Sequence, residues 1–395
     1  MTSKERVLAA LELREPDRVP VMDLLNDYAV VNTILGKKPN PVSRLFSNRL
    51  TAAALDRFLP VFNRTPLGPW ATQSEMAKFA YDAAAAASKM GEDAVWITFF
   101  PIFRMRSSKL VEDIFGRRMD VSFDRLGNMA TPLYRSGLIA SPADWQAWDK
   151  KPLLRLPEQA RRALAPVQRD FGEHLFLFPC VDFGLFENTW QPLGFERFAV
   201  ALRKERAWLG SMIDFHADLY CEMLEAVAEA GIPGIVYGDD LAYRSGPMVN
   251  PRLLEQIYGD GLRRLVEKAH SLGLKILMHS CGNVTDLLEW LADCGFDAIH
   301  PLEPTAGVDL AEAKKRVGGR LCLVGNLDIT YLLVEGTREE VFEAVRRAIS
   351  DAGPGGGFIL APDHSHSDIS VQRLKWMGEA AREYGPYPLK LEVTA

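Results

Sequence analysis

The sequence predicts an α/β fold, a (β/α)₈ TIM barrel with N-terminal helices and an inserted β-hairpin, and three observations support this. The chain has 395 residues, enough for one large barrel with additions. Eight short apolar segments alternate with segments of helical character. These apolar segments are continuous, as in parallel strands that are covered on both faces. Eight such units favour a closed barrel. A doubly wound open sheet is the alternative, but its Gly-x-Gly-x-x-Gly signature follows none of the strands.

The N-terminal quarter predicts one strand on each side of a helical region. Residues 2–13 are predicted to be a helix with Ser3 as its N-cap, and a Pro-Asp-Arg segment ends it. The first strand follows at Val19–Met22. The sequence then predicts helices, rich in alanine, as far as about Met90, and Asp93–Phe100 is predicted to be the second strand.

The next segment differs in character from the rest of the chain. Met119–Phe123 and Met129–Tyr134 flank a Leu-Gly-Asn turn, a pattern that predicts an antiparallel hairpin. We interpret residues 101–140 as an insertion within a single barrel domain that spans residues 1–395.

After the insertion the alternation of strands and helices becomes regular. The remaining strands are predicted at 175–180, 234–237, 274–278, 297–300, 321–324 and 358–361. Helices are predicted between and after them at 198–230, 251–272, 284–294, 310–317, 338–352 and 371–383.

Composition excludes several classes of function. The net charge is −6 and charged residues make up 25% of the chain, which gives no reason to expect nucleic acid or an anionic membrane as a partner. No apolar run approaches the ~18 residues that a membrane-spanning helix needs. The five cysteines are an odd and scattered set, unlike a disulfide framework. We therefore expect a cytoplasmic protein.

Polar and titratable side chains gather where the predicted strands end, and barrel enzymes place their chemistry at the C-terminal ends of strands. The residues at these ends are Asp23, Asn26, Asp27, Asp182, Glu187, Asn188, Asp239, Asp240, Tyr243, Arg244, His279, Cys281, His300, Glu303, Asn326, Asp328, Asp363, His364, His366 and Asp368.

The segment His279-Ser280-Cys281-Gly282 is the most informative of these strand ends. Residues two apart in a strand point to the same side, so the imidazole and the sulfur can reach one point. Gly282 permits a sharp turn after the strand. A nitrogen and a sulfur ligand together suit Zn²⁺. The alternative is a buried cysteine beside a histidine that binds a backbone carbonyl.

Several residues are candidates for the third metal ligand. Cys322 lies inside a strand, where it is better explained as core, and Cys180 is ambiguous. His364 follows the last strand and is favoured, and His366 could replace it. Asp239 and Glu303 are the expected carboxylates if a carboxylate, rather than water, is the fourth ligand. The alternative for both histidines is a polar loop that binds a substrate anion or caps a helix.

With these motifs in view, the chain resembles the uroporphyrinogen decarboxylase superfamily, which includes zinc-dependent methyltransferases linked to cobalamin. The resemblance rests on segments 5–11, 15–21, 279–283, 324–328 and 355–362, which occur in the family order. It implies a (β/α)₈ barrel, in agreement with the strand count. The chain lacks the Arg-Gln-Ala-Gly-Arg segment with which the decarboxylases bind porphyrinogen carboxylates and has Leu24–Tyr28 there. Porphyrinogen decarboxylation is therefore not expected.

The methyltransferase branch binds zinc through His-x-Cys and a later cysteine. His279 and Cys281 match the first pair, and His364 falls where that branch has its cysteine. An imidazole in place of a thiolate makes the site one unit more positive and favours Lewis-acid behaviour. The resemblance thus implies a site for one Zn²⁺ per chain, although the change of ligand also leaves open a barrel that has lost its metal.

Three functions follow as hypotheses. The first is transfer of a methyl group between a small thiol or methoxy compound and cobalamin, which a separate corrinoid protein would carry because the chain lacks an Asp-x-His-x-x-Gly motif. The second is a metal-independent lyase that decarboxylates a smaller acid, with Arg244 as the anion anchor and Asp239 as the acid/base. The third is a non-catalytic barrel that binds a corrinoid or tetrapyrrole. A homodimer is one candidate assembly.

The remaining strand-end residues are assigned roles that fit these hypotheses. Acid/base or orienting roles are predicted for Asp239, Asp240 and Glu303, and Tyr243 is predicted to donate to a substrate oxygen. A substrate-binding role is predicted for Asp182, Glu187, Asn188, Trp190, Arg244, Asn326 and His366.

Overall fold

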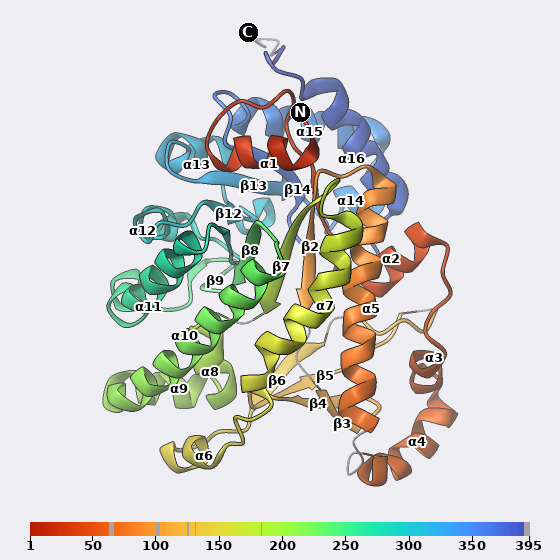
Figure 1. Cartoon of the computed structure of the whole chain (residues 1–395), viewed down its shortest axis with the longest axis vertical. Coiled ribbons are helices and arrows are strands. Elements are labelled where there is room, and N and C mark those ends of the chain that lie inside the picture. Colours follow the sequence, from red (N-terminus) through yellow and green to blue (C-terminus); the bar gives the residue numbers. More distant parts are fainter. Residues whose placement is uncertain (63–66, 100–102, 125, 131, 183, 391–395) are drawn as a thin grey trace.

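The computed structural model describes residues 1–62, 67–99, 103–124, 126–130, 132–182 and 184–390. Eight parallel strands form one sheet, in an order that follows the sequence (Figure 1). They are β1 (Met22–Leu24), β2 (Ala94–Phe99), β7 (Phe176–Asp182), β8 (Gly234–Gly238), β11 (Lys275–His279), β12 (Ala298–His300), β13 (Cys322–Leu327) and β14 (Phe358–Pro362). A parallel bridge between Val21 and Leu360 joins the two edges, so the predicted barrel is confirmed.

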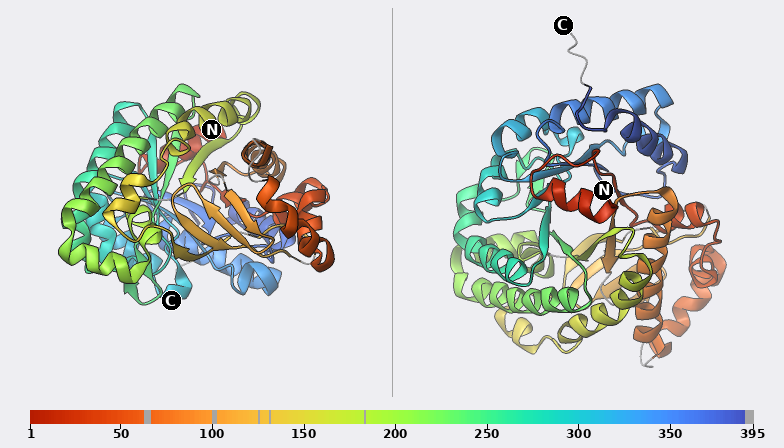
Figure 2. Two further views of the ribbon diagram at one scale, coloured as in Figure 1. Left: turned by 90° about the horizontal axis from the view of Figure 1, so that it is seen from below. Right: turned by 45° about the horizontal axis from the view of Figure 1, so that its top comes forward.

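The interior of the barrel is apolar and is covered at its N-terminal end by helix α1 (Ser3–Leu11). Inward-facing side chains, among them Trp96 and Phe178, form one cluster with Val7 and Leu11 of α1. Figure 2 shows α1 lying across this end of the barrel. The helix has a capping box in which Thr2, one residue before the predicted cap, accepts from the Glu5 amide. The N-terminal end is therefore closed, which leaves the opposite end for chemistry.

Helices cover the outside of the barrel. The larger ones are α4 (Arg49–Phe62), α5 (Leu67–Met90), α7 (Leu156–Phe171), α10 (Arg206–Glu229), α11 (Pro251–Ser271), α15 (Arg338–Ala352) and α16 (Val371–Tyr384). The shorter ones are α2 (Tyr28–Leu35), α3 (Pro41–Ser47), α6 (Pro142–Ala147), α8 (Glu187–Leu193), α9 (Phe195–Lys204), α12 (Leu288–Asp293), α13 (Leu310–Val317) and α14 (Leu332–Glu335). Short 3₁₀ turns occupy Leu153–Arg155, Thr285–Leu287 and Pro304–Ala306. No helix in the described ranges is both long and apolar enough to cross a membrane.

Most helix predictions agree with these bounds, and two differ. The helix predicted at 198–230 is two helices, because the chain leaves the helical conformation at Glu205 between α9 and α10. The helix predicted at 284–294 begins as a 3₁₀ turn and becomes α12 only at Leu288.

The insertion after β2 is larger than the predicted hairpin. It is a four-stranded antiparallel sheet of β3 (Phe103–Ser107), β4 (Leu110–Asp113), β5 (Arg117–Asp120) and β6 (Leu133–Gly137). The predicted pairing is present, with Met119 opposite Tyr134 and a further bridge from Phe123 to Met129. The first hairpin was missed. The sheet lies at the end of the barrel opposite α1 (Figure 1).

Candidate metal centre

The end of β11 presents two metal-ligand side chains on one side. His279 is the last residue of the strand, and Cys281 follows two residues later. Cys281 Sγ lies 3.4 Å from His279 Nε2. Gly282 then turns the chain with a φ of 85°, and a Cβ there would lie 2.7 Å from the Tyr243 carbonyl oxygen. The residue type at position 282 is thus fixed by both the turn and the close approach of a neighbouring loop.

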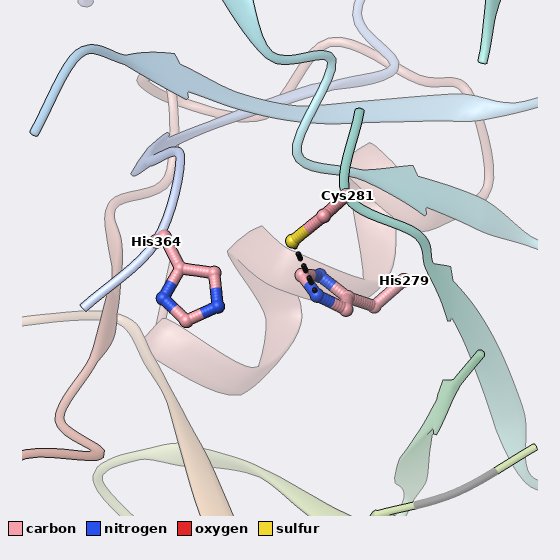
Figure 3. Close-up of side chains that lie close together, drawn as sticks. All are labelled: His279, Cys281 and His364. Atoms are coloured by element: carbon pink, nitrogen blue, oxygen red, sulfur yellow. Dashed lines mark hydrogen bonds between the residues drawn. The ribbon is translucent and has the colours of Figure 1, made fainter. Parts of the chain in front are cut away.

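His364, just beyond β14, completes a group of three. One ligand atom from each of His279, Cys281 and His364 lies within 4.8 Å of the others, and the sulfur sits between the two rings (Figure 3). His364 Nδ1 accepts from the Ser365 amide at 2.7 Å, which leaves Nε2 to face the other two side chains. Ligand atoms around a tetrahedral Zn²⁺ are separated by about 3.3–3.6 Å, given bond lengths near 2.0–2.3 Å. The donor set and its spacing therefore fit zinc after small adjustments.

The pKa values of His279 and Cys281 favour neutral side chains before a cation binds. Burial, and then the neighbouring His364, holds the pKa of His279 well below its ordinary value. Burial raises the pKa of the Cys281 thiol well above its ordinary value, and Asp240 and Glu303 raise it further. A neutral imidazole is ready to bind a metal, whereas the thiol must lose its proton as the metal binds.

The carboxylate of Asp240 lies close to two of the three candidate ligands. Its Oδ1 accepts from the Cys281 amide at 2.8 Å and lies 3.8 Å from His279 Nε2. Desolvation raises the pKa of Asp240. Burial raises the pKa of Glu187 well above its ordinary value, and the charge of Asp240 contributes next. The two carboxyl groups therefore form a pair that tends to retain a proton beside the candidate metal ligands.

The inserted sheet is connected to this carboxyl pair through buried side chains. Arg117 of β5 is fully buried and donates to Asp113. It also donates to Gln191 Oε1 at 2.7 Å, and Gln191 Nε2 in turn donates to Glu187. The insertion thus helps to set the position of Glu187, a link that the sequence did not suggest.

Asp239 and Glu303, the carboxylates expected as fourth ligands, hold loops in place. Asp239 accepts from the Phe186 and Glu187 amides and from the Tyr237 hydroxyl at 2.9–3.0 Å. Burial raises the pKa of Asp239 to about 7. Glu303 accepts from the Gly282 amide at 2.8 Å. Both carboxylates support the segments that carry site residues, and Asp240, not Asp239, accepts from the amide of Cys281.

The other predicted site residues are exposed or bind backbone groups. Tyr243 is 58% exposed, and Arg244 donates to the Thr305 carbonyl. Asn326 donates to the Leu302 carbonyl. The two ring nitrogens of His366 bind the Ile329 carbonyl and the Asp368 amide, so the backbone already occupies both.

Helix α8 and the end of β7 contain the remaining predicted substrate residues. Trp190 packs among Tyr134, Phe186 and Phe195. Asn188 is buried on the same helix. The side chain of Asp182 lies outside the described part of the structure.

His300 of β12 was predicted to lie at a strand end, but no role was predicted for it. It pairs with His279 in the parallel register, and the two Nδ1 atoms are 2.7 Å apart. His300 Nε2 lies 3.0 Å from the Pro362 carbonyl oxygen. Burial, followed by His279, holds the pKa of His300 well below its ordinary value. The only sequence signal was a histidine at the end of an adjacent strand.

Comparison with known proteins identifies the family to which this part of the chain belongs. Residues 191–384, which include all three candidate metal ligands, match the family model of uroporphyrinogen decarboxylase (URO-D). These residues form a URO-D-like domain that covers just under half of the chain. The superfamily resemblance inferred from the motifs is confirmed, although motif segments 5–11 and 15–21 lie outside the matched residues.

Relatives of this URO-D domain include both branches of the superfamily. Over 173 residues the chain is 28% identical to a methylcobamide:CoM methyltransferase, MtaA, of Methanosarcina barkeri, covering 44% of this chain and 48% of that protein. Over 185 residues it is 28% identical to the uroporphyrinogen decarboxylase of Actinobacillus succinogenes, covering 45% and 48%. The chain thus spans about half the length of the curated relatives it matches.

A solved structure extends the similarity of fold to the whole chain. A methyltransferase from Methanosarcina mazei superposes with a TM-score of 0.67, covering 97% of this chain and 99% of that one. The two chains are 19% identical, so this comparison supports the architecture and not the activity.

Proposed function

We propose that the protein is a zinc-dependent methyltransferase that moves a methyl group between a small thiol or methoxy compound and a corrinoid on a partner protein. The observation that carries the proposal is the convergence of His279, Cys281 and His364 at the C-terminal end of the barrel. The similarity to a methylcobamide:CoM methyltransferase supports it.

These three side chains would hold Zn²⁺, and Asp240 is the nearest described candidate for a fourth ligand. When bound, Zn²⁺ supplies Lewis acidity, which lowers the pKa of a substrate thiol or weakens the bond from a methoxy oxygen to its methyl carbon.

The Asp240 and Glu187 carboxyl pair is suited to handle the proton of this reaction. In demethylation of a methoxy compound, cobalt(I) supplies the electron pair for the new carbon–cobalt bond, and the oxygen keeps the pair of the broken bond and takes a proton. In methylation of a thiol, the sulfur loses its proton and supplies the electron pair of the new sulfur–carbon bond, and the corrinoid would keep the pair of the broken carbon–cobalt bond. A carboxyl group whose pKa is raised by burial can donate the proton in one case and accept it in the other.

A direct test combines metal analysis with an assay on free methylcobalamin. The purified protein is expected to contain about one zinc per chain, and a panel of thiols, coenzyme M included, should demethylate methylcobalamin, as followed by its absorbance. His279→Ala should lose both zinc and activity. As a control, His216→Ala removes a histidine that is buried on α10 among aromatic rings and should keep both.

Other outcomes would favour the other two hypotheses. Release of carbon dioxide from a carboxylic acid by zinc-free protein would replace the proposal with a lyase. Tight binding of a tetrapyrrole without any turnover would indicate a carrier or sensor. Either result, obtained with protein that contains no zinc, would contradict methyl transfer at this site.

A further inference from the structure

The proton arrangement around His279 and His300 can be worked out from the hydrogen bonds. The Pro362 carbonyl oxygen can only accept, so His300 Nε2, 3.0 Å away, must carry the proton in that bond. A neutral imidazole carries one proton, which leaves Nδ1 of His300 with a lone pair. This Nδ1 lies 2.7 Å from Nδ1 of His279. One of the two atoms must donate, and His279 is then the donor.

The opposite arrangement would place a charge where the structure offers it no partner. If His279 Nδ1 accepted, His300 would need protons on both nitrogens and would be an imidazolium. His300 is 0% exposed, and the described groups that face it are the His279 ring, the edge of Trp96 and a carbonyl oxygen. None of these is an anion, and an unpaired buried charge is strongly unfavourable.

We propose that His300 is a positioning residue that keeps the proton of His279 on Nδ1 and so directs the lone pair of Nε2 toward Cys281 and His364. This inference rests on the proposed function for its purpose, because a metal can bind only the unprotonated nitrogen. The hydrogen bonds themselves are those of the metal-free protein, so the position of the proton does not depend on the proposed function. Ligand histidines in metal sites commonly donate their second N–H to a fixed acceptor, and here another histidine is that acceptor.

The chain of hydrogen bonds also connects the strands that carry the site. It runs from His279 on β11 through His300 on β12 to Pro362 at the end of β14, two residues before His364. Trp96 on β2 packs edge-on against both rings, with centroid distances of 4.8 Å to His279 and 5.7 Å to His300. These contacts oppose rotation of either ring. The orientation of one candidate ligand is thereby coupled to the backbone that carries another.

Nitrogen NMR of the metal-free protein labelled with ¹⁵N-histidine tests the inference without any assay of activity. The ring nitrogens of His279, assigned by their loss in His279→Gln, should show a protonated Nδ1 and an unprotonated Nε2. In His300→Leu the same ring should move toward the mixture of tautomers found in free histidine. A wild-type His279 protonated at Nε2, or a tautomer unchanged in His300→Leu, would overturn the proposal.

Zinc titration against a chelator supplies the second readout. Loss of an orienting partner typically lowers metal affinity about 10–100-fold, and we expect a decrease of this size in His300→Leu. His300→Gln, whose amide can both donate and accept, should recover part of it. His216→Leu is the matched control, a second buried histidine on α10 that should leave zinc affinity unchanged. Equal affinity in wild type and His300→Leu would contradict the positioning role.

The two experiments separate this inference from the proposed function. If the wild-type protein binds no zinc, the function fails while the tautomer of His279 is still measured. If zinc binds and His279 is protonated at Nε2 in the metal-free protein, only the role of His300 fails. Should His300→Leu not fold, the wild-type spectrum and His300→Gln still decide the question.

Discussion

At the N-terminal end of the barrel, two arginines and two aspartates neutralise one another, whereas at the C-terminal end ligand and acid groups converge without that compensation. Asp93 lies between Arg6 and Arg18, with a contact of 2.6 Å to each, and Arg6 also contacts Asp17. At the other end, His279, Cys281 and His364 share one small volume. Burial raises the pKa values of the Asp240 and Glu187 carboxyl groups beside them, and the charge of Asp240 raises that of Glu187 further.

This difference separates residues that stabilise the fold from residues that are available for binding. Ion pairs at the base of a barrel satisfy their charges within the protein and need nothing further. At the opposite end, the thiol of Cys281 and the carboxyl groups of Asp240 and Glu187 have raised pKa values, so their ionised forms raise the free energy of the folded protein. A bound cation would relieve this. Substitutions at the two ends should therefore have different consequences.

Asp93→Asn should have the largest effect on stability. Its side chain is 1% exposed and, besides the two arginines, accepts from the Val21 amide. Removing its charge leaves Arg6 and Arg18 without a buried partner, which typically costs about 3–5 kcal/mol. Denaturant unfolding measures the loss. The amount of zinc bound per folded chain should not change. A parallel loss of zinc would contradict the separation of stabilising residues from binding residues.

Cys281→Ser should have the converse effect. Structural zinc sites of four ligands bind with about 10–16 kcal/mol, so one ligand contributes roughly 3–4 kcal/mol, or a few hundredfold in affinity. The unfolding free energy of the metal-free protein should hardly change. Cys322→Ala is the control, because Cys322 packs in the barrel interior and should affect stability but not zinc. Retained zinc affinity in Cys281→Ser would remove the metal site from the proposal.

The sequence predicted those parts of the molecule that depend on local pattern. The barrel was recognisable because its strands are continuous apolar runs, and His279 with Cys281 because side chains alternate along a strand. The first hairpin of the insertion was missed because charged residues such as Arg104 and Glu112 interrupt its apolar pattern. That segment has no continuous apolar run to mark its strands.

Parts that depend on register between strands could not be read from the sequence. The role of His300 follows from its position opposite His279 in the pairing of β11 with β12. Which of Asp239 and Asp240 is the better candidate for a fourth metal ligand depends on the side of the chain that each faces after β8. Adjacent residues face opposite sides there. Hydrogen bonds distinguish the two side chains, since Asp239 accepts from the Phe186 amide and Asp240 from the Cys281 amide.

Asp27→Asn tests whether an ionised carboxyl group at the C-terminal end of the barrel lowers the stability of the folded protein. Burial raises the pKa of Asp27 to about 6, mainly because its side chain is 2% exposed. The folded protein thus favours the protonated form, so this contribution to stability is complete below about pH 4 and is lost as the pH rises through 6. Asparagine stays neutral and also caps helices well, as Asp27 caps α2.

The variant should therefore match the wild type near pH 4 and exceed it at pH 8 by up to about 3 kcal/mol, given 1.36 kcal/mol per pKa unit. Unfolding free energies across this range measure the difference. Parallel curves for the two proteins would show that Asp27 ionises as readily in the folded state as in the unfolded one.

The variants Gly273→Ala and Gly282→Ala add the same methyl group at the two ends of strand β11. Gly273 precedes β11 and Gly282 follows it, and both have a positive φ, 75° and 85°. A Cβ at position 273 meets nothing within 4 Å, whereas at position 282 it would lie 2.7 Å from the Tyr243 carbonyl oxygen. Backbone strain is common to both variants and costs about 1–3 kcal/mol, so their difference isolates the clash.

We expect that clash to displace the candidate metal ligands. The Gly282 amide donates to Glu303, and the adjacent Cys281 amide donates to Asp240, so a displaced loop moves the sulfur relative to the two imidazoles. We expect Gly273→Ala to lower the unfolding free energy alone and Gly282→Ala to lower zinc affinity as well. Equal zinc affinity in the two variants would mean that the loop after β11 can move without disturbing Cys281, and the close packing against Tyr243 would then serve stability only.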